Sequence, residues 1–168
     1  MRVLGIDPGL AITGYGLIDT DSNHEYLCID YGVITTPSSF NDSDRLQLLY
    51  DELTQLLINY KPDVSSIEKL FFQKNVKTAI AVGQARGVVL LALSQSKLPV
   101  WEYTPNEIKQ TVCGYGSAGK QQVQRMVQML LSLEDIPAPD DAADALAAAI
   151  CQIHHQSFLS KVNPGAKP

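Results

Sequence analysis

The chain has 168 residues, of which 45% are hydrophobic and 18% are charged, and its formal net charge is −5. These values are typical of one globular domain. No apolar run reaches the ~18 residues that a membrane-spanning helix needs, so we expect no association with a membrane. The three scattered cysteines and the lack of a signal-peptide pattern lead us to expect a cytoplasmic protein with reduced thiols.

The charge is distributed unevenly along the chain. Residues 69–125 hold eight Lys or Arg and two Glu, a net charge of +6, whereas the rest of the chain carries −11. A positive middle region in an acidic chain is what a local nucleic-acid-binding face would produce. A chance grouping of solvated surface charges is the alternative.

The predicted elements begin with a short buried strand at residues 3–6 that ends in a carboxylate, Asp7. The Pro-Gly pair at residues 8–9 keeps Asp7 extended and then turns the chain. A carboxylate at the end of an apolar strand loses solvation energy unless a cation pairs with it. Asp7 is therefore the first candidate functional residue.

Two more strands are predicted, at residues 10–19 and 26–35. The third shows the alternation of apolar and polar residues that is typical of strands, and the short connections favour an antiparallel meander. Gly14 and Gly16 leave room in the second strand for the close approach of another backbone.

An amphipathic helix follows from residue 43 and ends at a Lys-Pro pair, residues 61–62. The next strand, residues 64–68, again ends in a carboxylate, Glu68. Because this strand follows a helix, we expect it to lie parallel to the first strand. That arrangement would place Asp7 and Glu68 at the same edge of the sheet.

The second half of the chain predicts a helix at residues 76–94, a strand at 99–103 and three more helices, the last from residue 140 to about Ser157. The helix at 76–94 is apolar on almost all sides, and one face of a sheet cannot bury the whole circumference of a helix. Either the domain core wraps around it or a second subunit covers it, and we favour a homodimer. The order of elements predicts an α/β fold with a mixed five-stranded sheet flanked by helices. We expect one domain over residues 1–158 and a flexible tail over 159–168.

Four carboxylates form the strongest candidate site. Asp141 and Asp144 lie one turn apart at the start of the last helix, where carboxylates are favoured. Helix capping is an alternative for Asp141, and Asp140 is an equally good cap. Capping does not explain Asp144, nor the two strands that end in Asp7 and Glu68. Carboxylates gathered in one place repel each other unless cations bind, and such oxygen ligands select Mg²⁺ or Mn²⁺.

A basic, aromatic loop at residues 69–75 is the second candidate site. Phe71 or Phe72 would stack on an unpaired base there, and Lys74 would hold a phosphate. The alternative is that both aromatic side chains pack beneath the loop.

The segment at residues 114–120 nearly matches a nucleotide-binding phosphate loop, but Gln121 replaces the required Ser or Thr. The preceding segment also predicts a helix and not a strand, so we reject nucleotide binding. Lys109 and Lys120 fit better as phosphate contacts on a basic edge. The histidine pair at residues 154–155 is interpreted as surface residues near a helix end and not as metal ligands.

Six stretches follow one another along nearly the whole chain: Gly5-Ile-Asp-Pro-Gly9, Ile67-Glu68 with Phe71 and Lys74-Asn75, Gly83-Gln-Ala-Arg-Gly87, Glu102-Tyr103, Lys109-Gln-Thr-Val112 and Asp141-Ala-Ala-Asp-Ala-Leu146. Together they resemble the bacterial Holliday-junction resolvases, the RuvC-type crossover-junction endonucleases. The resemblance implies a ribonuclease-H-like fold and a homodimer. It also implies paired symmetric nicks across four-way junction DNA, made by divalent-metal hydrolysis during recombination and repair.

The resemblance further implies roles for particular residues. The catalytic and metal-binding acids would be Asp7, Glu68, Asp141 and Asp144, with two Mg²⁺ ions per active site and Mn²⁺ as a substitute. The DNA contacts would be Phe71 (with Phe72 as a second candidate for the base wedge), Lys74, Asn75, Lys109 and Lys120. A branch-migration helicase complex of the RuvA/RuvB type would be a partner.

Two other classes of protein remain as alternatives. An actin-like or sugar-kinase-like ATPase also opens with Gly-Ile-Asp-x-Gly and a hairpin, but it needs two such domains and this chain has room for one. A catalytically silent nucleic-acid-binding module of the same fold is the other alternative, and the four intact carboxylates argue against it.

Overall fold

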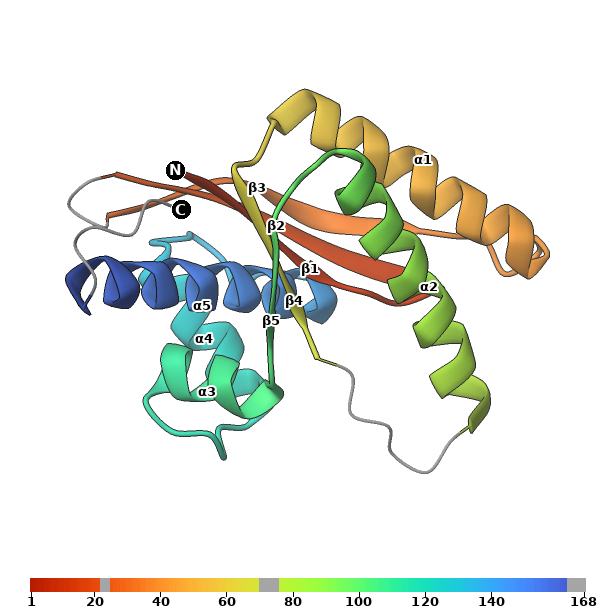
Figure 1. The fold of residues 1–168 in the computed structure, drawn as a ribbon. Helices are drawn as coiled ribbons and strands as arrows, with labels where there is room; N and C mark the ends of the chain where they lie inside the picture. Colours follow the sequence, from red (N-terminus) through yellow and green to blue (C-terminus); the bar gives the residue numbers. More distant parts are fainter. Residues whose placement is uncertain (22–24, 70–75, 163–168) are drawn as a thin grey trace.

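The structure is a computed structural model that describes residues 1–21, 25–69 and 76–162. Within these residues the strands and helices follow one another in the predicted order (Figure 1). The elements are β1 (Arg2–Asp7), β2 (Ile12–Thr20), β3 (Tyr26–Thr35), α1 (Asp42–Tyr60), β4 (Val64–Glu68), α2 (Val76–Gln95), β5 (Val100–Tyr103), α3 (Pro105–Cys113), α4 (Lys120–Leu130) and α5 (Asp140–Val162).

The five strands form one mixed sheet in the order β3-β2-β1-β4-β5. The first three strands are antiparallel neighbours, which confirms the predicted meander. β4 lies parallel to β1, and β5 lies parallel to β4, because each is reached through a helical connection. This arrangement confirms the mixed five-stranded sheet flanked by helices that the sequence predicts.

Helices cover both faces of the sheet (Figure 1). On one face α1 and α2 bury leucines and valines against the sheet, among them Leu49, Leu53 and Val89. On the other face α3, α4 and α5 enclose a second apolar cluster, in which Leu146 and Ile150 of α5 are fully buried. The sheet therefore separates two hydrophobic cores, and the site lies where its central strands end.

The first turns of α5 lie directly on the backbone of β1 and β2. A Cβ atom on Gly14 would lie 2.0 Å from the carbonyl oxygen of Asp141, and one on Gly5 would lie 1.9 Å from that of Ala145. Any larger residue at these strand positions would push the helix away. The close approach predicted for Gly14 is confirmed, whereas the sequence analysis predicted no such approach at Gly5.

The C-terminal end of the chain differs in part from the sequence analysis. Helix α5 continues to Val162, past the expected end near Ser157, while residues 163–168 of the predicted tail lie outside the described residues. The division at residue 158 stays a prediction. Among the described helices none is long and apolar enough to cross a membrane.

Candidate active site

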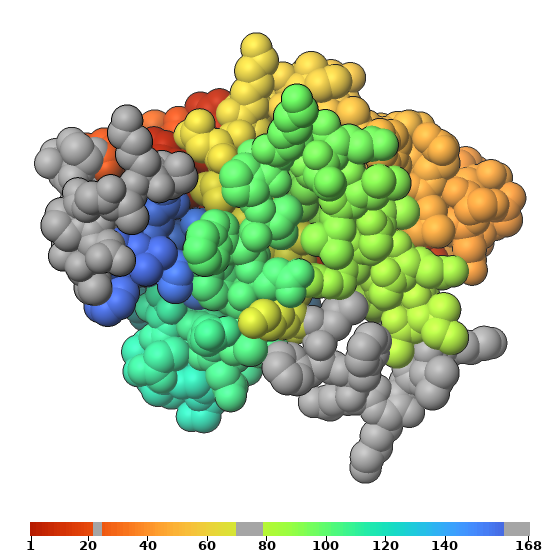
Figure 2. Space-filling model, in the orientation of Figure 1, coloured from red at the N-terminus to blue at the C-terminus, as the bar shows by residue number. Residues whose placement is uncertain are grey.

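The ends of β1 and β4 bring two carboxylates to the same edge of the sheet. Asp7 is the last residue of β1 and Glu68 the last of β4, and the parallel register pairs Ile6 with Ile67 immediately before them. In Figure 1, β4 ends between α2 and α3, and in Figure 2 this yellow end of the strand reaches the surface between α2 and the α3–α4 region. The predicted meeting of Asp7 and Glu68 is therefore present.

A hydrogen-bonded turn fixes the chain direction just after Asp7. The hydroxyl of Thr13 donates to the carbonyl oxygen of Gly9 at 2.7 Å, and the backbone N–H of Gly9 donates back to the same hydroxyl at 3.3 Å. Thr13 is 1% exposed, so this pair of bonds is shielded from water. The turn ends the strand at Asp7 and leads the chain directly into β2.

The carboxylate of Asp7 carries the clearest electrostatic signature of the site. Burial raises its pKa, and the negative charges of Asp144, Glu68 and Asp141 raise it further, to about 7. The positive charge of Lys120 opposes this shift of the pKa of Asp7. Because such interactions require proximity, the four acids predicted from the sequence share one electrostatic environment.

Glu68 and Asp144 are perturbed in the same direction. Burial raises the pKa of Glu68, the charge of Asp144 raises it further, and Lys109 and Lys120 lower it. Burial likewise raises the pKa of Asp144, against the lowering effect of Lys120. Three carboxylates from two strands and one helix thus resist ionisation together, which is the behaviour of a site that a cation would complete.

Lys120 places a cation among these carboxylates. Its ammonium group pairs with Asp140 and, at 3.2 Å, with Asp144. Burial alone would lower the pKa of Lys120, but the hydrogen bond to Asp140 and the charge of Asp144 raise it above its usual value. The hydrogen bond from Lys120 lowers the pKa of Asp140, which is half-exposed. The sequence analysis did not predict these two ion pairs, and its assignment of Lys120 as a phosphate contact stays a prediction.

The carboxylates are near one another without forming a closed metal site. Within the described ranges, no three Asp, Glu, His or Cys side chains are spaced to hold an ion as they stand. The pairing of Lys120 with Asp144 is consistent with this open spacing, because an ammonium group already neutralises one of the carboxylates. The donors themselves are all carboxylate oxygens, which suit a hard divalent ion.

The remaining sequence candidates fall in different places. Lys109 lies half-buried on α3, close enough to lower the pKa of Glu68. Four candidates lie outside the described residues, namely Phe71, Phe72, Lys74 and Asn75.

The structure supports the rejection of nucleotide binding at residues 114–120. The segment before the phosphate-loop lookalike is the helix α3, not a strand, and Lys120 begins α4. His155 packs against the rings of Trp101 and Tyr103, with centroid distances of 5.3 and 5.7 Å.

One residue near the site was not given a role by the sequence analysis. Arg86 of α2 donates a hydrogen bond to the backbone oxygen of Glu68 and pairs with Glu102 of β5. A signal was available, because Arg86 is the only charged residue between Thr78 and Gln95 in an otherwise apolar helix.

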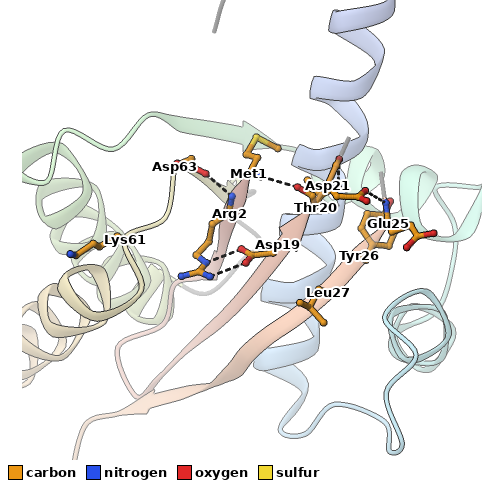
Figure 3. A pocket seen from close by; sticks show the side chains of 10 residues that line it. All are labelled: Met1, Arg2, Asp19, Thr20, Asp21, Glu25, Tyr26, Leu27, Lys61 and Asp63. Carbon is orange, nitrogen blue, oxygen red and sulfur yellow. Dashed lines mark hydrogen bonds and ion pairs between the residues drawn. The ribbon is translucent and has the colours of Figure 1, made fainter. Parts of the chain in front are cut away.

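A hollow of about 650 Å³ lies at the opposite end of β1, around Met1 and Arg2 (Figure 3). The guanidinium of Arg2 in this hollow already has a partner, because it donates two hydrogen bonds of 2.8 Å to the carboxylate of Asp19. The backbone N–H of Arg2 donates to Asp63 at 2.6 Å. These bonds tie strand ends together, so we interpret this hollow as structural.

A ribonuclease-H-like sheet with acids gathered at the ends of its central strands is typical of metal-dependent nucleases. Residues 3–152 match the family described as crossover junction endodeoxyribonuclease RuvC. Relatives of that description from Halothermothrix orenii and Caldicellulosiruptor saccharolyticus are 58% and 56% identical, covering 99% and 95% of this chain and 99% and 96% of theirs. The chain belongs to the RuvC family of crossover junction endodeoxyribonucleases.

A solved structure supports the same assignment. The protein described as Thermus thermophilus RuvC in complex with a Holliday junction substrate superposes with a TM-score of 0.89 at 30% identity, covering 94% of this chain and 96% of that one. Family membership makes the chain a nuclease and favours neither the ATPase nor the silent binding module.

Proposed function

We propose that this protein is a structure-selective endonuclease that resolves four-way DNA junctions by paired symmetric nicks. The observation that carries the proposal is the shared electrostatic environment of Asp7, Glu68 and Asp144 at one sheet edge. Membership of the crossover junction endodeoxyribonuclease family supports the junction as substrate.

The acids fit a divalent metal, and we propose Mg²⁺, with Mn²⁺ as a substitute. The ligands would be Asp7, Glu68, Asp141 and Asp144, whose oxygen donors suit these ions. A pair of such ions supplies an activated water and stabilises the leaving 3′ oxygen in phosphodiester hydrolysis. The raised pKa of Asp7 supports this assignment, because a bound dication would offset both the burial of this carboxylate and its repulsion by the neighbouring acids.

The chain's own cations would hold the DNA backbone beside the acids. Lys120 and Lys109 both lie close enough to the acids to affect their pKa values, so each is within reach of a phosphate bound there. On binding DNA, Lys120 would exchange its contact with Asp144 for a phosphate oxygen. Phosphate binding would explain why two lysines lie beside an acidic site, although the chain as a whole is negatively charged.

The loop at residues 69–75 is proposed to contact the junction through Phe71, Lys74 and Asn75. The proposal rests on the sequence, because this loop lies outside the described residues apart from Lys69. Phe71→Ala is expected to reduce junction cleavage more than Phe72→Ala. If single-turnover assays give the reverse order, Phe72 is the base wedge.

We further propose that the enzyme works as a homodimer in the cytoplasm and cooperates with a branch-migration helicase complex of the RuvA/RuvB type. Two copies of the site, one on each subunit, would account for two symmetric nicks. The family resemblance supports the helicase partner.

The decisive experiment compares an immobile four-way junction with linear duplex of the same sequence. We expect nicking of the junction only, dependent on Mg²⁺ or Mn²⁺, with 5′-phosphate products. Asp7→Asn should abolish cleavage and leave junction binding intact. A wild-type protein that binds junctions but never cuts them, across several metals and sequences, would refute the proposed function.

A further inference from the structure

Arg86 is a nearly buried cation in the apolar helix α2. Its side chain is 12% exposed, and its neighbours Ala85 and Val89 are fully buried in the core. Burying a guanidinium is unfavourable unless its N–H donors find acceptors. The identity of those acceptors therefore indicates what this residue does.

Both acceptors of Arg86 belong to the strand ends next to the carboxylate site. Nη1 donates to the backbone carbonyl oxygen of Glu68 at 2.9 Å. Nη2 pairs with Oε1 of Glu102 at 2.7 Å, on the adjacent strand β5. One planar guanidinium thus joins α2 to the last residue of β4 and to its neighbouring strand, a geometry that the ammonium of lysine cannot reproduce.

This contact lies where the sheet no longer holds Glu68 from both sides. The ladder between β1 and β4 ends with the pair Ile6 and Ile67, one residue before Glu68. On the other side β5 still holds the chain, because the N–H of Lys69 donates to the carbonyl oxygen of Tyr103 at 2.7 Å. Arg86 adds a second restraint at the residue that carries the carboxylate.

The same strand end is tied to the helix that carries the other acids. The hydroxyl of Tyr103 donates to the side-chain oxygen of Gln152 in α5 at 2.6 Å. Tyr103 and Gln152 are 5% and 1% exposed, so this bond is shielded from water. A continuous set of contacts therefore runs from Arg86 through β5 to α5.

We infer that Arg86 is a positioning residue that fixes the backbone of Glu68, and through it the Glu68 carboxylate, for metal binding. The inference rests on the proposed function, because it assumes that Glu68 is a metal ligand. Residues that orient ligands without touching the metal commonly change metal affinity by about 10- to 100-fold when they are replaced. Arg86 would act in this way by holding the backbone carbonyl of Glu68, and Glu102 would orient the guanidinium of Arg86.

Two other roles for Arg86 would give different results. A residue that only stabilises the fold would lower the unfolding midpoint and leave metal affinity unchanged. A residue that binds DNA phosphate would weaken junction binding and reduce its salt dependence.

The test compares Arg86→Ala, Arg86→Lys and Glu102→Gln with a matched control, Arg2→Ala. Arg2 also donates to a backbone carbonyl, that of Tyr60, but at the opposite end of β1. It pairs with a carboxylate as well, that of Asp19 (Figure 3). Mn²⁺ affinity of the DNA-free protein is measured by electron paramagnetic resonance titration. Junction affinity in chelator, single-turnover cleavage against Mn²⁺ concentration, and the unfolding midpoint are measured on the same samples.

We expect Arg86→Ala to weaken Mn²⁺ binding by about tenfold and to keep junction affinity within about twofold of wild type. Cleavage should fall at low Mn²⁺ and recover in part at high Mn²⁺. Arg86→Lys should retain part of the affinity, and Glu102→Gln should lose less than Arg86→Ala. Arg2→Ala should lower the unfolding midpoint without changing Mn²⁺ affinity.

The inference is overturned if Arg86→Ala binds Mn²⁺ as wild type does, if Arg2→Ala weakens Mn²⁺ binding equally, or if Arg86→Ala loses junction affinity instead. Should Arg86→Ala fail to fold, Arg86→Lys and Glu102→Gln decide the same question. A wild-type protein that neither binds Mn²⁺ nor cuts junctions refutes the proposed function itself. Normal wild-type behaviour with an unchanged Arg86→Ala refutes only the role of Arg86.

Discussion

Asp7 links the stability of the metal-free protein to pH. Burial and the charges of Asp144, Glu68 and Asp141 raise its pKa from 3.8 to about 7 in the folded chain. A raised carboxylate pKa favours the folded state fully below pH 3.8, and this contribution is lost as the pH rises through about 7. At ~1.4 kcal/mol per pKa unit, the loss amounts to a few kcal/mol.

Asp7→Asn should therefore be more stable than wild type at pH 8 in chelator, with a smaller advantage at pH 5. Urea unfolding at the two pH values measures this difference. Asp19→Asn is a control of opposite sign, because the hydrogen bond from Arg2 lowers the pKa of Asp19 and its loss should destabilise the protein at pH 8. An Asp7→Asn variant that is less stable than wild type at pH 8 would contradict the prediction.

Adding Mg²⁺ should reverse the order of stability at pH 8. Only the wild-type site has all four of the proposed carboxylate ligands, so Mg²⁺ binding to the folded state should raise its unfolding free energy by mass action. Because the carboxylates must lose protons to bind, this stabilisation should shrink as the pH falls below about 7. Equal Mg²⁺ stabilisation of wild type and Asp7→Asn would argue against Asp7 as a ligand.

Asp140 and Asp141 are neighbours with different surroundings. Asp141 contributes to the raised pKa of Asp7, whereas the charge of Asp140 is matched by Lys120. We expect Asp141→Asn to abolish junction cleavage and Asp140→Asn to reduce it by about tenfold or less, as expected for a residue that acts through another. Single-turnover rates measure both effects, and the reverse ranking would make Asp140 the ligand.

At the scale of the element, the position of α5 depends on a glycine in the sheet. A Cβ at Gly14 would meet the carbonyl oxygen of Asp141, so Gly14→Ala should push the start of α5 outward. We expect a loss of about 1–3 kcal/mol of stability, typical of overpacking, and a larger proportional loss of cleavage. Urea unfolding and single-turnover cleavage measure the two effects.

Gly116→Ala is the stability control for that variant. Its Cβ would lie 3.5 Å from the backbone of Asn106, an ordinary contact. Equal stability of the two variants would show that α5 can move at no cost.

The sequence predicted the backbone of the fold and of the candidate site better than it predicted the side-chain contacts. The strand ends at Asp7 and Glu68 followed from local apolar patterns, and the helical crossover fixed their shared edge. The contact between Lys120 and Asp144 was not predictable, because it depends on how α4 and α5 pack and no local pattern encodes that. The dual contact of Arg86 was missed for the same reason, although a lone charge in an apolar helix is a usable signal.

At the scale of the whole molecule, α2 carries the surface that we propose for dimerisation. Two large apolar side chains of this helix are exposed, Leu91 at 52% and Ile80 at 58%. If a second subunit covers this face, Leu91→Lys should convert a dimer to a monomer, because a charge would be buried at the interface. Light scattering at micromolar concentration measures the mass.

The matched control for the dimer is Ile58→Lys, at a site 59% exposed on α1. This variant should remain dimeric, and a monomeric wild-type protein would rule out the predicted interface. Loss of paired cutting in Leu91→Lys, with single nicks retained, would show that the two cuts need two subunits.

The packing of α5 on the sheet also has a consequence for the newly made chain, because α5 carries two of the four proposed catalytic acids. Asp7 and Glu68 leave the ribosome early, but Asp141 and Asp144 belong to a helix that is made after every strand of the sheet. A nascent or truncated chain that lacks α5 therefore holds only two of the four acids. If these four acids form the proposed metal site, such a chain should bind junctions without cutting them, and local detachment of α5 should have the same effect.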